Sequence, residues 1–243
     1  MKQFKICYSF YFLLLLILFS PKQYIVYKLI ICLFVHELGH LLFIWLFKYK
    51  YSKIEISIFG IFMELNKNKQ IFYKDLIIYL GGIVFNYLFF LITKDGDFKL
   101  INLLLIIVNI MPIYPLDGYN ILKTIMFKII PHYFSLILLK TISLIILCLS
   151  SIYGILISVD LFVFISLLYL VVINIMSIFN INYLHKSFLL DKYLYKWKYK
   201  KKQIRFKGDF KPYFYKYNNI YVILNDNIIE EETILESIFN IAS

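Results

Sequence analysis

The segment from Tyr24 to Phe47 is almost wholly apolar and long enough to cross a membrane as a helix, yet its second half carries three ionisable side chains. They are His36, Glu37 and His40, in the pattern His-Glu-x-x-His. Residues i and i+4 share a helix face, so both imidazoles can reach one metal ion, with Glu37 beside them to activate a water. Each ionisable group at membrane depth costs at least ~2.5–3.5 kcal/mol, which indicates a functional site.

The composition of the whole chain agrees with a membrane setting. Of the 243 residues, 61% are hydrophobic, against roughly 45–50% in soluble domains, so we predict an integral membrane protein. The net charge is +11, and eleven Lys and Arg residues against two acids lie between Lys186 and Lys216. A basic stretch directly after the last apolar segment favours a cytoplasmic anchor on the lipid bilayer. No recognition module accompanies it, so we expect no direct nucleic-acid partner.

The apolar segments predict the fold class: an all-α membrane protein with about six transmembrane helices, a short β-hairpin insertion and a small C-terminal cytoplasmic region. The expected spans cover residues 6–21, 24–47, 76–92, 100–116, 133–159 and 161–184. The transmembrane domain is then 1–184 and the tail 185–243, which contains a strand-like 220–224 and a helix-like 230–241. Lysines cluster at alternate boundaries, which predicts cytoplasmic termini and a site that opens towards the cytoplasm.

Two polar features interrupt the later apolar segments. The span at 76–92 contains Gly81 and Gly82, which permit close helix contact or local unwinding, and Asn86, whose amide needs a partner if it is buried. The next span runs into Asn109-Ile-Met-Pro-Ile-Tyr-Pro-Leu-Asp117-Gly, where two prolines must break the helix. Asp117 stands at this break, either as a helix cap or as a functional carboxylate.

The sequence from His36 to His40, combined with Asn109-x-x-Pro-x-x-Pro-Leu-Asp117-Gly, resembles the site-2 protease family of intramembrane zinc metalloproteases, peptidase family M50. The resemblance covers residues 24 to about 125, and the size and tail are most similar to its sporulation branch, that of stage IV sporulation protein FB. It implies regulated intramembrane proteolysis of a membrane-associated protein substrate, a sporulation pro-sigma factor. Membrane inhibitor or regulator proteins are the other expected partners.

The resemblance also implies the roles of individual residues. Zinc would be the cofactor, Glu37 the general base, and two asparagines would help to position the substrate. The implied zinc ligands are His36, His40 and Asp117, and the implied substrate-positioning asparagines are Asn86 and Asn109.

The polar stretch after the first motif contains one strictly alternating segment, with Ile54, Ile56 and Ile58 on one face. Gly60 and a second apolar run follow, which predicts a β-hairpin, with an irregular surface loop as the alternative. A helical substrate must be unwound before hydrolysis, and a free strand edge can satisfy its backbone groups. We therefore expect residues 54–59 to form an edge strand that positions the substrate.

Three other functions compete with proteolysis. A proteolytically inactive membrane chaperone or assembly factor on the same fold would have no need of Glu37. A zinc transporter would need repeated polar sites along a path, whereas one cluster stands alone here. A protease of the prenyl-protein-processing kind takes its third ligand from a later glutamate, and no Glu occurs between Glu64 and Glu230.

Overall fold

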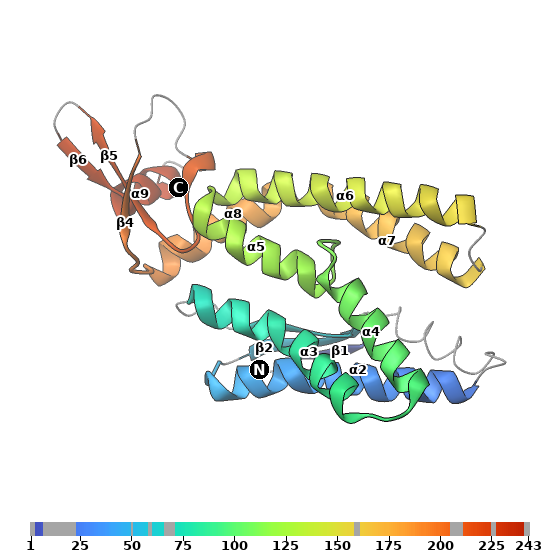
Figure 1. The fold of residues 1–243 in the computed structure, drawn as a ribbon. Helices are drawn as coiled ribbons and strands as arrows, with labels where there is room; N and C mark the ends of the chain where they lie inside the picture. Colours follow the sequence, from blue (N-terminus) through green and yellow to red (C-terminus); the bar gives the residue numbers. More distant parts are fainter. Residues whose placement is uncertain are drawn as a thin grey trace. The chain divides into compact units, whose positions relative to one another are not determined.

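The computed structural model describes residues 3–6, 23–49, 51–57, 60–65, 71–157, 161–204, 211–224 and 227–240. Helices dominate, with two small sheets (Figure 1). In chain order the elements are β1 (Gln3–Ile6), α2 (Gln23–Leu46), β2 (Tyr51–Ser57), β3 (Gly60–Leu65), α3 (Phe72–Ile92), α4 (Gly96–Ile110), α5 (Asp117–Ile129), α6 (His132–Ile157), α7 (Leu161–Phe179), α8 (Ile181–Tyr195), β4 (Lys201–Ile204), η1 (Lys211–Tyr213), β5 (Asn219–Leu224), β6 (Asn227–Glu230) and α9 (Glu231–Asn240).

Long apolar helices mark the chain as an integral membrane protein. Within the described ranges, α2, α3 and residues 132–154 of α6 are long and apolar enough to cross a bilayer. Residues 166–179 and 181–195 form a pair bent by 56° that adds a fourth span if the two helices are taken together. At 15 residues, α4 is only about 22 Å long. Residues 7–22, most of the first predicted span, lie outside the described residues, so six spans are not confirmed.

By its internal contacts the chain divides into two compact units. The first contains residues 1–66, 73–111 and 115–121, and the second contains residues 67–72, 112–114 and 122–243. His36, Glu37, His40 and Asp117 all fall in the first unit.

In the first unit, α2 and α3 cross in very close contact at two glycines. A methyl group at Gly39 would lie 2.3 Å from the carbonyl oxygen of Gly81, and one at Gly81 would lie 2.7 Å from the carbonyl oxygen of Gly39. Only residues without a Cβ allow two helix backbones to approach so closely. Of the two roles predicted for the glycine pair, close helix contact is the one observed, and α3 is helical throughout. This contact brings the face of α3 against the histidines of α2.

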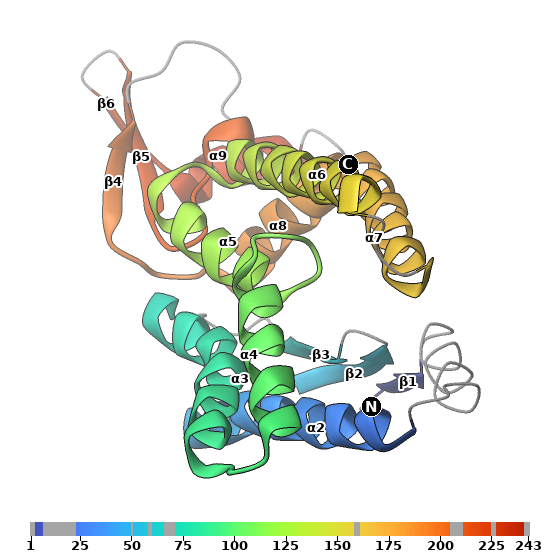
Figure 2. The same cartoon turned by 45° about the vertical axis from the view of Figure 1, so that its right-hand side comes forward.

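The hairpin predicted between residues 53 and 65 is present, because β2 and β3 pair antiparallel. The sheet has the order β1-β2-β3, with β1 parallel to β2, so β2 is the middle strand (Figure 2). The expectation that this segment is an edge strand is wrong, because Ile54 and Ile56 pair with Phe4 and Ile6 on one side and with β3 on the other. Ile58 and the adjoining Phe59 lie outside the described residues.

In the second unit, polar side chains secure the backbone where the helix is broken before Asp117. The N–H of Tyr114 donates to Ser143 Oγ at 2.9 Å, and Asn174 Nδ2 donates to the carbonyl oxygen of Tyr114 at 2.8 Å. Ser143 Oγ in turn donates to Asn174 Oδ1 at 2.6 Å. Non-helical backbone at membrane depth needs such partners, and the buried Ser143 and Asn174 supply them from α6 and α7.

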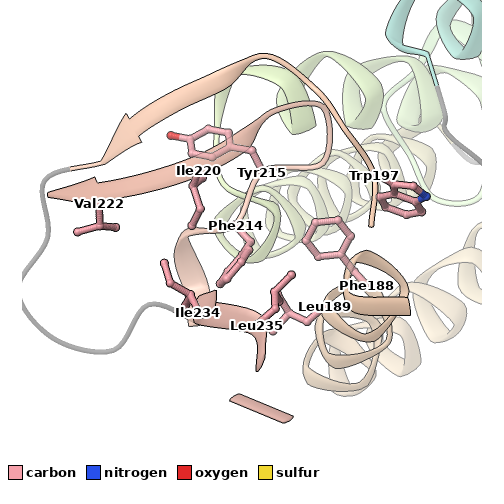
Figure 3. Close-up of a cluster of buried hydrophobic side chains, with 9 residues drawn as sticks. All are labelled: Phe188, Leu189, Trp197, Phe214, Tyr215, Ile220, Val222, Ile234 and Leu235. Carbon is pink, nitrogen blue, oxygen red and sulfur yellow. The ribbon is translucent and has the colours of Figure 1, made fainter. Parts of the chain in front are cut away.

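The tail has its own hydrophobic core, to which α8, β5, α9 and the segments before β4 and β5 contribute (Figure 3). The predicted tail strand and helix are present as β5 and α9. Lys192 and Glu231 form a buried ion pair at 2.8 Å, and the Glu231 carboxylate also accepts from the N–H of Ile220. The core residues are Phe188, Leu189, Trp197, Phe214, Tyr215, Ile220, Val222, Ile234 and Leu235.

Candidate metal centre

Two histidines from α2 and an aspartate from α5 converge inside the first unit. His36 Nε2 lies 2.9 Å from Asp117 Oδ2, His40 Nε2 lies 3.1 Å from the same oxygen, and the two Nε2 atoms are 3.2 Å apart. His36 and Asp117 are 81 positions apart in the sequence. Of the His, Cys, Asp and Glu side chains that the structure describes, these three form a group able to hold a metal ion.

The tautomer of His40 follows from its second nitrogen. His40 Nδ1 lies 2.7 Å from the carbonyl oxygen of Ile78, which can only accept, so Nδ1 carries a hydrogen. In the neutral ring Nε2 then presents a lone pair to Asp117 Oδ2, so that two electron-rich atoms face each other at 3.1 Å. Such an arrangement requires a positive charge between them, either a proton on the imidazole or a metal ion.

Asp117 reaches the histidines because the chain turns sharply at the predicted break. Residues 111–116 are non-helical, and Asp117 is the first residue of α5, where a carboxylate is also favoured by the helix dipole. A methyl group at Gly118 would lie 2.1 Å from the carbonyl oxygen of Ile110. The glycine after Asp117 therefore allows α5 to begin directly against the end of α4.

The three side chains suit zinc in type and in spacing. Zinc takes imidazole nitrogen and carboxylate oxygen at about 2.0–2.1 Å, which places tetrahedral ligands about 3.3–3.4 Å from one another. The observed separations of 2.9, 3.1 and 3.2 Å are shorter by a few tenths of an ångström, so a small outward movement accommodates the ion. Three protein ligands also leave the fourth position for water, as in catalytic zinc sites.

Gly82 of α3 leaves room for the two histidines, a role that no sequence motif assigns to it. A methyl group at Gly82 would lie 2.5 Å from His36 Cε1, His36 Nε2 and His40 Nε2. A side chain at this position of α3 would therefore require both imidazoles to move. The four-residue spacing of Ile78, Gly82 and Asn86 is the signal that could have identified this face, because such residues align along one side of a helix.

The other predicted site residues occupy different settings. Glu37 is half-buried on α2, one residue from His36. Asn86 is completely buried, with Nδ2 3.1 Å from His36 Nδ1, so it contacts a histidine of the site. Asn109 is in the last turns of α4 and donates to the carbonyl oxygen of Leu105. Their substrate-positioning roles stay predictions, as does the role of Glu37.

The arrangement of the helices has a known counterpart. A solved structure, the site-2 protease from Methanocaldococcus jannaschii, superposes with a TM-score of 0.55 at 20% sequence identity. The match covers 71% of this chain and 88% of that protein. The chain has the fold of a site-2 protease. No protein-family model matches the sequence, and the search of curated proteins gives no match.

Proposed function

We propose that the chain is an intramembrane zinc metalloprotease of the site-2 protease type, which hydrolyses a peptide bond of a membrane-associated protein. The observation that carries this proposal is the convergence of His36, His40 and Asp117 within 3.2 Å of one another, with both histidines and Glu37 on a helix long and apolar enough to span a membrane. Charged and metal-ligating groups are costly at membrane depth, so their assembly at one point needs a function. The site-2 protease fold supports the same proposal.

The chemistry of the residues present is sufficient for peptide hydrolysis. Zinc held by His36, His40 and Asp117 would lower the pKa of a water to about 7 and polarise the scissile carbonyl. Glu37 takes a proton from the attacking water and delivers it to the leaving amine, so that water and the amide give one carboxylic acid and one amine. The Ile78 carbonyl holds the ring of His40 in the required tautomer throughout.

The substrate and its regulators follow from the sequence resemblance. We expect a membrane-associated protein, with the pro-segment of a sporulation sigma factor as the most specific suggestion, and membrane-bound inhibitors as regulators. The cytoplasmic opening of the site rests on the short distance from His40 to the polar stretch that begins at Lys48, eight residues or about 12 Å along a helix.

A paired measurement of metal content and cleavage tests the proposal. The purified chain should contain close to one zinc per molecule and cleave a membrane-tethered reporter substrate. Glu37→Gln should keep the zinc and lose cleavage by at least about 100-fold, because general base catalysis contributes ~10²–10⁴. His36→Ala and Asp117→Ala should lose both. Full zinc retention in these last two variants, or normal cleavage by Glu37→Gln, would refute the assignment.

A further inference from the structure

Asn86 on α3 holds its side-chain amide against the first histidine of the site. The residue is 0% exposed, and its Nδ2 lies 3.1 Å from His36 Nδ1. Its Oδ1 is also buried and has no hydrogen-bond partner within the part of the chain that the structure describes. An unsatisfied buried acceptor costs about 1–3 kcal/mol, so a second arrangement in which this oxygen is used has to be considered.

The present arrangement fits a metal-free ring. When Asn86 Nδ2 donates to His36 Nδ1, the hydrogen of the neutral imidazole is on Nε2, from where it donates to Asp117 Oδ2 at 2.9 Å. In this state His36 Nε2 has no lone pair for a metal ion. The tautomer that the amide now favours is thus the one that cannot act as an Nε2 ligand.

Metal binding through Nε2 reverses these requirements. The hydrogen must move to His36 Nδ1, and the atom that faces Nδ1 must then be an acceptor. A half-turn of the Asn86 amide exchanges the positions of its nitrogen and oxygen with almost no change in shape. This turn would bring Asn86 Oδ1, which has no partner among the described residues, to the His36 Nδ1–H of the metal-bound state, which needs an acceptor.

His40 already has this arrangement, and the same helix supplies it. Its Nδ1 donates to the carbonyl oxygen of Ile78, four residues before Gly82 and eight before Asn86. These three positions lie along one side of α3. Ile78 offers its carbonyl to His40, Asn86 offers its amide to His36, and Gly82 leaves room for both rings between them. This side of α3 therefore complements the two histidines.

We propose that Asn86 is a positioning residue: in the zinc-bound protein its amide is reversed, and Oδ1 accepts a hydrogen bond from His36 Nδ1–H. The inference rests on the zinc centre proposed above. It assigns Asn86 to the orientation of a metal ligand, in place of the substrate contact that the sequence resemblance implies. Groups that orient ligating histidines typically contribute 10–100-fold in metal affinity.

Zinc affinity of the full-length protein, measured by competition with a chelator, tests the role directly. Asn86→Leu removes the acceptor at nearly constant volume and should weaken zinc binding by about 10–100-fold. Asn86→Asp keeps an acceptor and cannot donate through the lost amide, so it should bind zinc at least as tightly as the wild type. The matched control is Asn102→Leu. Asn102 is also 0% exposed, and its Oδ1 also lacks a partner among the described residues. Its Nδ2 donates to Cys32 Sγ and to the carbonyl oxygen of Phe98, and to neither histidine.

The outcomes separate the inference from the proposed function. If the wild type binds zinc and folded Asn86→Leu binds it equally well, Asn86 does not position His36. A raised KM of this variant at unchanged zinc affinity would assign Asn86 to substrate positioning. If Asn86→Leu does not fold, Asn86→Asp decides, and a large loss of affinity there overturns the inference. Nitrogen NMR of the imidazoles should find the hydrogen on His36 Nδ1 in the zinc-loaded wild type and Asn86→Asp. Failure of the wild type to bind zinc would instead refute the zinc centre itself.

Discussion

Gly82→Ala is the substitution for which the structure predicts the most specific effect. The added methyl carbon would lie 2.5 Å from atoms of both imidazoles, about 0.9 Å short of ordinary van der Waals contact at 3.4 Å. In the metal-free protein the rings can turn away to relieve this overlap. In the metal-bound protein they cannot, because both Nε2 atoms must stay on the ion, so the strain appears as lost affinity.

The size of the effect follows from the cost of overpacking. Extra methylene or methyl groups in a well-packed site cost typically about 1–3 kcal/mol, which corresponds to a loss of zinc affinity of about 5- to 150-fold. Competition with a chelator measures this loss. The higher helix propensity of alanine stabilises the metal-free and the metal-bound protein equally, by up to ~1 kcal/mol, so it does not change the zinc affinity.

Two other glycines serve as controls. A methyl group at Gly96, at the start of α4, would have no atom of the described residues within 4 Å, so Gly96→Ala should leave zinc affinity unchanged. Gly39→Ala meets the backbone of Gly81 and should lower the thermal stability of the protein by separating α2 from α3. The reasoning is refuted if Gly82→Ala binds zinc as tightly as Gly96→Ala does.

Two further predictions concern the tail and the topology. Lys192→Met should destabilise the tail by about 3–5 kcal/mol, because it leaves the Glu231 carboxylate buried without its cation. Lys201→Met is the control, because it removes only an exposed ion pair worth less than about 1 kcal/mol. Hydrogen exchange of β5 measures both losses of stability, and equal losses would contradict the prediction. Reporter fusions after Ser243 and in the loop between α3 and α4, residues 93–95, should report opposite sides of the membrane. The same side for both would refute the proposed orientation.

The features of the fold that the sequence predicts are those with a local pattern. The helix that carries His36 and His40, the break before Asp117 and the β-hairpin all appear where apolar periodicity, proline and alternation place them. The tail strand and helix, β5 and α9, follow from the same kinds of pattern. Each of these depends on the intrinsic preferences of neighbouring residues, which act within a few positions along the chain.

The features that the sequence does not predict depend on partners that are remote in the chain. The carbonyl of Ile78 is a backbone group, and no pattern of side chains identifies it as the acceptor for His40, which is 38 residues away. The sequence permits a close helix contact or local unwinding at Gly81 and Gly82, but the contact of Gly82 with the imidazoles depends on the crossing of α2 and α3 at Gly39. Lys192 would be assigned to the basic surface by composition, yet Glu231 accompanies it into the tail core from 39 residues away.

The position of β2 changes how a substrate strand could be held. A middle strand has its backbone groups engaged on both sides. Ile56 of β2 pairs with Ile6 of β1 on one side and with Ile61 of β3 on the other. Proline at Ile56 would therefore disrupt the sheet itself, so a loss of cleavage in that variant would not identify a substrate contact. In the described sheet the outward-facing backbone groups belong to β1 and β3. An extended peptide that joins this sheet by strand addition has to pair with one of those two strands, since strand addition requires unpaired N–H and C=O groups.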